Sequence, residues 1–145
     1  MTPIEQETLL MDLCGRQYYN VKVQYHGNKI GTLVSLFDLT EYSNGERHPL
    51  ISVYGTDGTP YKVKPESIKP YLIPLSKMSE RQKEEYYYIV NYLSEDDTEN
   101  YVEGEFIYTA QLTQLLGFYH RNNIDYRGLI PMGLAIDATG LNIYD

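Results

Sequence analysis

The side chains best suited to metal binding or nucleophilic catalysis are one cysteine and three histidines, Cys14, His26, His48 and His120. Zinc sites draw most of their ligands from short local spacings, and none of the histidines has a partner at such a spacing. A nucleophile with its base would require the fold to bring Cys14 to His26 or His120. We expect instead that Cys14 is a small buried hydrophobe, and we predict neither a metal site nor cysteine catalysis.

Other signatures of catalysis are absent from the sequence. It has no glycine-rich phosphate loop ending in Lys-Ser or Lys-Thr and no Gly-x-Ser-x-Gly nucleophile turn. A calcium loop is suggested only by Asp96, Thr98 and Asn100 at alternate positions. An EF-hand then requires a glycine and a glutamate, where this chain has Tyr101 and Ile107. We therefore expect a protein that is not an enzyme and carries no cofactor.

The segment Asp125–Gly128 places an acid, an aromatic ring and a base beside a glycine. One interpretation is a binding site in which the planar guanidinium of Arg127 holds a carboxylate or phosphate. The other is structural: Asp125 caps a turn, and Arg127 pairs with Asp125 or with a carbonyl. We favour the structural interpretation because capping is a common use of aspartate, and we keep Arg127 as a candidate binding residue.

The negative charge of the chain comes entirely from its second half. The formal net charge is −8, with eight basic and eight acidic residues in 1–77 but four basic and twelve acidic residues in 78–145. An acidic chain with scattered Lys and Arg argues against direct nucleic-acid binding, which needs clustered basic residues. The acidic candidates for binding a partner lie close together: Glu95, Asp96, Asp97, Glu99, Glu103 and Glu105.

Tyrosine is in large excess, with sixteen Tyr, three Phe and no Trp. A tyrosine ring is rigid and apolar with a polar tip, so it is favoured on surfaces that bind other proteins. An AT-rich genome or strand formation explains the excess equally well. The candidates in the first half are Tyr25, Tyr54, Tyr61 and Tyr71. The candidate binding residues in the second half are Tyr87, Tyr88 and Tyr92.

The sequence also indicates the cellular compartment. A single cysteine cannot form an intramolecular disulfide. The first residues are acidic where a signal peptide is basic, and no apolar run reaches the roughly 20 residues of a membrane span. We expect a cytoplasmic protein with no membrane association.

The first half, residues 1–77, predicts a short helix followed by a small β-barrel. Thr2 with Glu5 forms a capping box, Pro3 suits the first helical position, and Gly15 is a natural stop. Five short strands should follow, separated by turns at Gly27-Asn28, Asn44-Gly45 and Asp57-Gly58 and by a helical turn at 65–67. The last strand, 69–73, lies between prolines and is expected at an edge. This outline is that of an SH3-like small barrel.

The second half, residues 78–145, predicts an acidic helical region packed on that barrel as one compact α+β unit. Ser79 with Gln82 forms a second capping box, and the helix it starts should run to about Leu93. Residues 94–105 are predicted to form a solvated loop. A further helix is expected from about 106 to 122, with Leu112 among its inward-facing residues. The irregular tail after it is too apolar to stay uncovered, so it should fold back on the core.

Four stretches of the chain carry a resemblance: Leu10–Cys14, Lys69–Ser79, Asn123–Ile130 and Gly133–Ile136. They resemble small uncharacterised proteins encoded by phages and mobile elements of gut bacteria. The resemblance spans most of the chain in order, but it leaves out residues 27–60 and the acidic loop. It implies an accessory gene of a phage or integrated element whose product binds a host or phage component.

Three functions are compatible with these observations. The first is a non-enzymatic binding protein that recognises a protein partner through exposed tyrosines. The second is an acidic inhibitor that imitates nucleic acid and blocks a basic groove of a host defence or replication enzyme. The third is an enzyme or a small-ligand binder with an unrecognised pocket near Arg127, or a structural protein of a phage.

Overall fold

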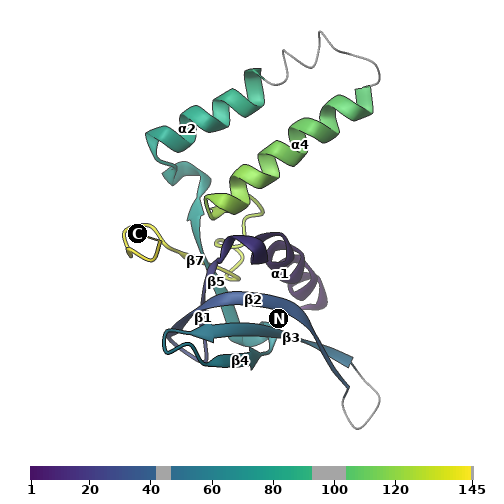
Figure 1. The fold of residues 1–145 in the computed structure, drawn as a ribbon, viewed down its shortest axis with the longest axis vertical. Helices are drawn as coiled ribbons and strands as arrows, with labels where there is room; N and C mark the ends of the chain where they lie inside the picture. The colour runs from purple at the N-terminus through teal and green to yellow at the C-terminus, as the bar shows by residue number, and fades with distance from the viewer. Residues whose placement is uncertain (42–46, 93–103, 145) are drawn as a thin grey trace.

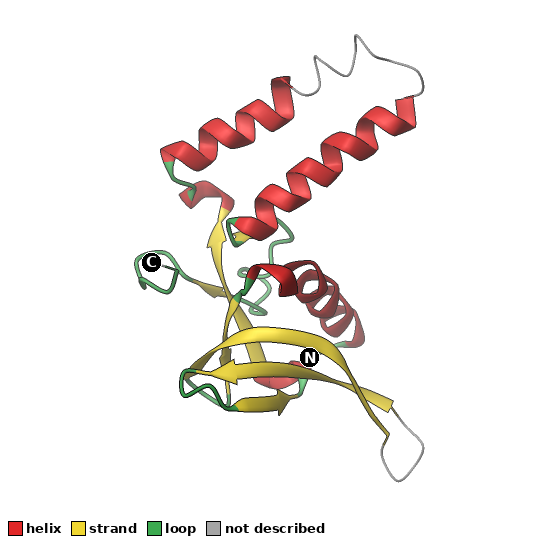
Figure 2. Cartoon of the chain, viewed as in Figure 1, coloured by secondary structure: helices red, strands yellow, loops and turns green. Residues whose placement is uncertain are grey.

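The chain folds as an α+β protein in which a twisted sheet is joined to a helical hairpin (Figures 1 and 2). The structure is a computed structural model, and it describes residues 1–41, 47–92 and 104–144. Helix α1 lies against the sheet, and the hairpin of α2 and α4 projects away from it. No helix in the described ranges is long and apolar enough to cross a membrane.

Helix α1 spans Pro3–Arg16 and begins as the sequence predicts. The Thr2 amide donates to Oε2 of Glu5 at 2.8 Å, and the Glu5 amide donates to Oγ1 of Thr2 at 3.1 Å. Such a cap stabilises a helix by about 1 kcal/mol. Contrary to the prediction, Gly15 does not end the helix. A 3₁₀ turn follows Arg16, and Asn20 after it adopts the left-handed conformation, with a φ of 56°.

The sequence is also wrong about the buried side of α1. Cys14, which we predict to be buried, is exposed. The residues that α1 buries are spaced i, i+3, i+4, i+7: Leu9, Asp12, Leu13 and Arg16. Two of these residues are charged. A prediction that counts only apolar residues therefore assigns the wrong face of the helix to the core and places Cys14 inside.

The sheet is a meander of five strands with two short additions from the C-terminal segment. The strands are β1 Lys22–Tyr25, β2 Lys29–Glu41, β3 Arg47–Gly55, β4 Pro60–Val63, β5 Ile68–Pro74, β6 Ile124–Asp125 and β7 Ile136–Asp137. Their order is β4-β3-β2-β1-β5-β6, and β7 also pairs with β5. In β1 the alternation predicts the faces correctly: Val23 and Tyr25 are buried between less buried neighbours. The Asn44-Gly45 turn signal lies outside the described residues.

The predicted helical turn before the last strand of the meander is confirmed as a 3₁₀ turn at Pro65–Ser67. Strand β5, however, is not at an edge. It pairs with β1 on one side and with β6 and β7 on the other. Its prolines do not prevent this, because the bonds to the C-terminal segment run from the Ile73 amide to Asn123 O and from the Ala138 amide to Leu72 O, both at 2.8 Å.

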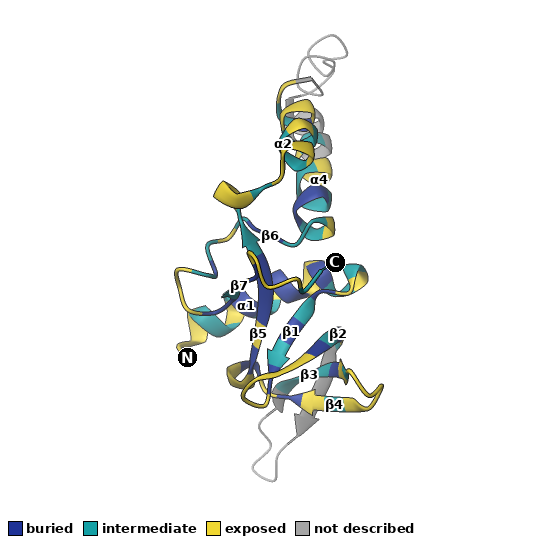
Figure 3. Ribbon diagram, turned by 90° about the vertical axis from the view of Figure 1, so that its left-hand side faces the viewer, coloured by how far each residue is buried: buried dark blue, intermediate teal, exposed yellow. Residues whose placement is uncertain are grey.

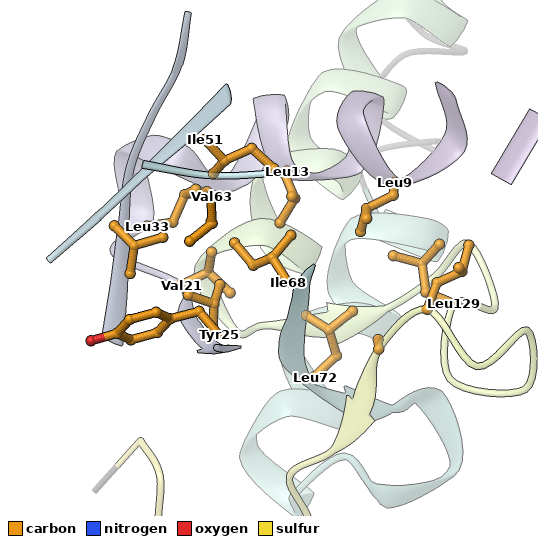
Figure 4. Packing of buried hydrophobic residues seen from close by; sticks show 14 residues of the cluster. Leu9, Leu13, Val21, Tyr25, Leu33, Ile51, Val63, Ile68, Leu72 and Leu129 are labelled. Atoms are coloured by element: carbon orange, nitrogen blue, oxygen red, sulfur yellow. The ribbon is translucent and has the colours of Figure 1, made fainter. Parts of the chain in front are cut away.

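The sheet is open rather than closed into a barrel. In the described residues β4 lies at one end of the strand order and β6 at the other. The apolar face is covered by α1 and by the C-terminal segment, so the core is formed without closure. Figure 4 shows Leu9 and Leu13 of α1 pointing toward Ile68 and Leu72 of β5. Strand β5 is buried along most of its length (Figure 3).

The C-terminal segment folds back as expected and completes this core. Leu129 is fully buried, and Leu134 and Ala135 pack in the same cluster as the sheet residues. Near the end of the chain, Tyr144 is fixed between two strands: its hydroxyl accepts from the Lys22 amide at 3.0 Å and donates to Tyr71 O at 2.6 Å. Burial raises the pKa of this phenol well above its ordinary value.

The helical hairpin consists of α2, Glu80–Tyr87, a π-helical segment Tyr88–Tyr92, and α4, Gly104–Arg121. The Ser79 capping box is present, with the Gln82 amide donating to Oγ of Ser79 at 3.2 Å. Leu112 is 55% exposed, contrary to expectation, because α4 turns Leu115, Phe118 and Tyr119 inward. The hairpin therefore has an apolar cluster of its own, centred on Phe118.

Candidate functional site

Two of the predicted tyrosines form an exposed pair on the hairpin. Tyr87 ends α2 and is 59% exposed, and Tyr88 begins the π-helical segment and is 53% exposed. We call these two residues the tyrosine surface. The backbone of Tyr92 lies in the same π-helical segment, but its side chain lies outside the described part of the chain, as does that of Glu105 in α4. Glu95, Asp96, Asp97, Glu99 and Glu103 lie outside the described residues altogether.

The tyrosine surface rests on a series of ring contacts. Tyr87 contacts Tyr86 edge to face, with centroids 5.7 Å apart. Tyr86 in turn lies 6.2 Å from Phe118 and 6.5 Å from Tyr119, and Tyr119 stacks on Tyr126 at 4.8 Å with an angle of 11°. Aromatic pairs of this kind contribute about 0.5–1.5 kcal/mol each beyond area burial. Tyr87 is therefore presented from a packed support.

The backbone beneath the tyrosine surface is irregular. The chain changes from α-helix to π-helix at Tyr88, and π-helical turns occur frequently at functional sites. Across the hairpin, Gln111 Nε2 donates to Val90 O at 2.9 Å. This bond from α4 satisfies a carbonyl of the π-helical segment and helps to hold it. The geometry is that of a surface supported from across the hairpin.

A buried ion pair lies at the base of the hairpin, and our sequence interpretation missed it. Asp12 and Arg16 are both fully buried, with Arg16 Nε 2.6 Å from Asp12 Oδ2 and Nη2 3.1 Å from Oδ1. Arg16 Nη2 also donates to Ile124 O at 2.6 Å, immediately after α4. The signal in the sequence was the i, i+4 spacing of an acid and a base on one helix.

Arg127 belongs to this base rather than to an open binding site. Its Nε lies 3.4 Å from Asp12 Oδ1, its side chain is 31% exposed, and its guanidinium lies 5.2 Å from the centre of the Tyr126 ring. Asp125 caps the following turn, as the structural interpretation holds, accepting from the amides of Leu129 and Ile130 at 2.8 and 2.9 Å. The partner of Arg127 is thus Asp12 and not Asp125.

His120 and His26 lie in different surroundings, and the side chain of His48 lies outside the described part of the chain. His120 Nε2 lies 2.9 Å from the Tyr126 hydroxyl, whereas His26 lies at the β1–β2 turn against Tyr25 and Tyr61. Burial and then the nearby Arg16 charge lower the pKa of His120. In the described part of the chain, no three His, Cys, Asp or Glu side chains are placed to hold a metal ion.

Comparison of the chain with protein-family models, with curated proteins and with solved structures finds no match.

Proposed function

We propose that this chain is a non-enzymatic protein-binding module and that Tyr87 and Tyr88 are the centre of its contact surface. The observation that carries the proposal is the exposure of two consecutive rings, 59% and 53%, on a hairpin whose inner face is packed. Tyrosine is enriched among the residues that dominate protein interfaces, because it buries a large area at a small cost in side-chain entropy.

The chemistry around the tyrosine surface indicates the kind of partner. Residues 94–105 follow it in the sequence with six acidic side chains and no basic one. A partner of complementary chemistry offers an apolar depression for the rings, bordered by Lys or Arg. Charges at the border of an interface mainly accelerate association, and their effect decreases as salt is added. The phage or mobile-element context that the resemblance implies makes a host or phage protein the expected partner.

The sheet supports the proposal as a scaffold. Five consecutive strands in the order β4-β3-β2-β1-β5, with a 3₁₀ turn before β5, follow the outline of SH3-like small barrels. We propose that the sheet is an open variant of this outline. In this proposal the sheet supports the hairpin, and the hairpin carries the surface that contacts the partner.

A pull-down from bacterial host lysate tests the proposal. The tagged chain is compared with the double variant Tyr87→Ala/Tyr88→Ala, and retained proteins are identified by mass spectrometry after washing at low and at high salt. The matched control is Tyr18→Ala/Tyr54→Ala, which removes two rings that are 84% and 48% exposed elsewhere. We expect a partner that the control retains and the test variant loses, with affinity lowered about tenfold or more.

Two other results would overturn the proposal. A partner bound equally by both double variants excludes the tyrosine surface. If that partner is also lost at high salt, and neutralising the acidic residues of 94–105 to Asn and Gln abolishes its binding, the chain is the acidic mimic of nucleic acid.

A further inference from the structure

A second candidate site lies on the sheet, away from the tyrosine surface. A surface hollow of about 420 Å³ is situated between the β1–β2 turn and the β3–β4 turn. Its walls include the rings of Tyr25 and Tyr61, and its border carries Lys29 and Asp57. Nothing in the binding surface proposed above involves these residues.

Two of the residues that line the hollow are aromatic, and their rings pack together with His26. The rings of Tyr25 and Tyr61 lie 5.4 Å apart, and His26 lies 5.2 Å from the first and 6.0 Å from the second. Tyr25 is only 3% exposed. Figure 4 shows its hydroxyl end pointing out of the apolar cluster. Tyr25 is therefore a packed support, and the partly buried Tyr61 is the ring that a ligand can reach.

Two glycines make room for that wall. Gly31 of β2 and Gly55 of β3 are opposite each other in the sheet. A Cβ at Gly31 would lie 2.9 Å from Tyr25 Cε1, and one at Gly55 would lie 2.8 Å from the Tyr25 hydroxyl. Glycine weakens a strand, and within strands it often marks a close approach of other groups. Here a facing pair of glycines admits the ring that lines the hollow.

The border of the hollow carries one charge of each sign, Lys29 and Asp57. Asp57 Oδ1 accepts from the Thr59 amide at 3.0 Å, and hydrogen bonding to Thr59 is the main cause that lowers the pKa of this carboxyl. Asp57 is therefore ionised at neutral pH. The Lys29 ammonium lies 5.8 Å from the centre of the Tyr61 ring, within the range of a cation–π contact. The chain thus places its own ammonium group on this ring.

We infer that the hollow binds the methylated ammonium group of a lysine side chain from another protein, and that Lys29 competes for the same ring. Aromatic walls recognise methylated ammonium groups through cation–π attraction and contact with the methyl groups. An unmethylated ammonium is more strongly hydrated, so it gains less from leaving water for an aromatic wall. When the Lys29 side chain moves off the ring, the ionised Asp57 is the counter-charge that faces the incoming cation.

The test uses three probes: N-acetyl-trimethyllysine amide, the same compound with unmodified lysine, and an uncharged analogue with a tert-butyl end. Binding is followed through the NMR signals of the tyrosine rings at constant ionic strength. We expect the trimethylated probe to bind the full chain more tightly than either of the others. Choline serves as a further arm, since equal binding of choline would assign the site to free quaternary amines instead of peptides.

Variants make the inference specific. Lys29→Ala removes the internal competitor and should tighten binding about two- to fivefold. Lys83→Ala removes the same charge from exposed α2 and should leave binding unchanged. Tyr61→Phe keeps the aromatic face and should bind, whereas Tyr61→Leu and Asp57→Asn should weaken binding severalfold.

Two results would overturn the inference: a Lys29→Ala variant that binds no more tightly than Lys83→Ala, and an uncharged analogue that binds as well as the cation. Lys29→Gln provides a second removal of the competing charge with the side-chain length nearly kept. The Tyr87→Ala/Tyr88→Ala variant should bind the trimethylated probe normally, so failure of one site is distinguishable from failure of the other.

Discussion

Replacing Asp12 with asparagine should destabilise the protein more than any change to its exposed ion pairs. In the folded chain the Asp12 carboxylate receives two bonds from Arg16, at 2.6 and 3.1 Å, and lies 3.4 Å from Arg127. Asp12 and Arg16 are both fully inaccessible to solvent. The variant Asp12→Asn keeps the shape of the side chain and removes its charge, so the Arg16 charge stays buried without its counter-ion.

The expected loss follows from what remains around Arg16. Its Nη2 keeps the bond to Ile124 O, while Nη1 is already buried without a hydrogen-bond partner in the described part of the chain. Breaking one side of a buried pair typically costs about 3–5 kcal/mol. We expect Asp12→Asn to lower the free energy of unfolding by about that amount, and Arg127→Gln to lower it by no more than about 1 kcal/mol because that contact is longer and partly exposed.

Urea unfolding followed by circular dichroism measures both losses. The control is Lys83→Gln, which removes an exposed i, i+3 contact with Glu80 at 3.4 Å and should change the free energy by less than about 0.5 kcal/mol. The double variant Asp12→Leu/Arg16→Met should recover much of the loss, since apolar replacement of a buried pair is often tolerated. A loss below about 1 kcal/mol for Asp12→Asn would refute this account of the hairpin base.

Two further predictions concern the contact of α1 with His120. Gly15→Ala should destabilise the fold by about 1–3 kcal/mol, because its Cβ would lie 2.5 Å from His120 Cε1. Gly117→Ala would meet nothing within 4 Å and should raise the free energy of unfolding by about 0.4–1 kcal/mol. Thermal unfolding of both variants checks these opposite signs. The pKa of His120 is lower in the folded chain than its ordinary value of 6.5, so the unfolded chain takes up the proton first and the free energy of unfolding should fall as pH is lowered below that value. Urea titrations between about pH 7 and 5.5 should show this slope, and His120→Gln should reduce it; an unchanged slope would assign it to other groups.

The parts of the fold that were predictable depend on local chemistry. The two capping boxes at Thr2 and Ser79 fix helix starts through bonds within three residues. The alternation of β1 fixes its buried face, and Pro65 fixes a 3₁₀ turn through its ring. Each of these features depends on only a few neighbouring residues, so each can be predicted from a single sequence.

The parts that were wrong depend on contacts between distant residues. Strand β5 is interior because two dipeptides, β6 and β7, pair with it from the C-terminal segment, and two residues are too few to give a strand pattern. Cys14 is outside because the buried pair of Asp12 and Arg16 determines which side of α1 is covered. The glycine pair of Gly31 and Gly55 is similarly invisible, since its meaning depends on the register of β2 with β3.

The hairpin and the sheet are joined through the last turn of α1, and this joint decides whether the two proposed surfaces act together. Arg16 bonds the backbone after α4, and His120 of α4 lies against Gly15. A partner that contacts both the tyrosine surface and the ring hollow meets them already oriented, which lowers the entropy cost of binding. Under conditions where the Asp12→Asn variant is still folded, the substitution should weaken the binding of such a partner. It alters neither surface but loosens the contact that orients them. A partner that uses one surface should bind the variant as it binds the parent chain, so the same substitution that tests the base also separates one-site from two-site recognition.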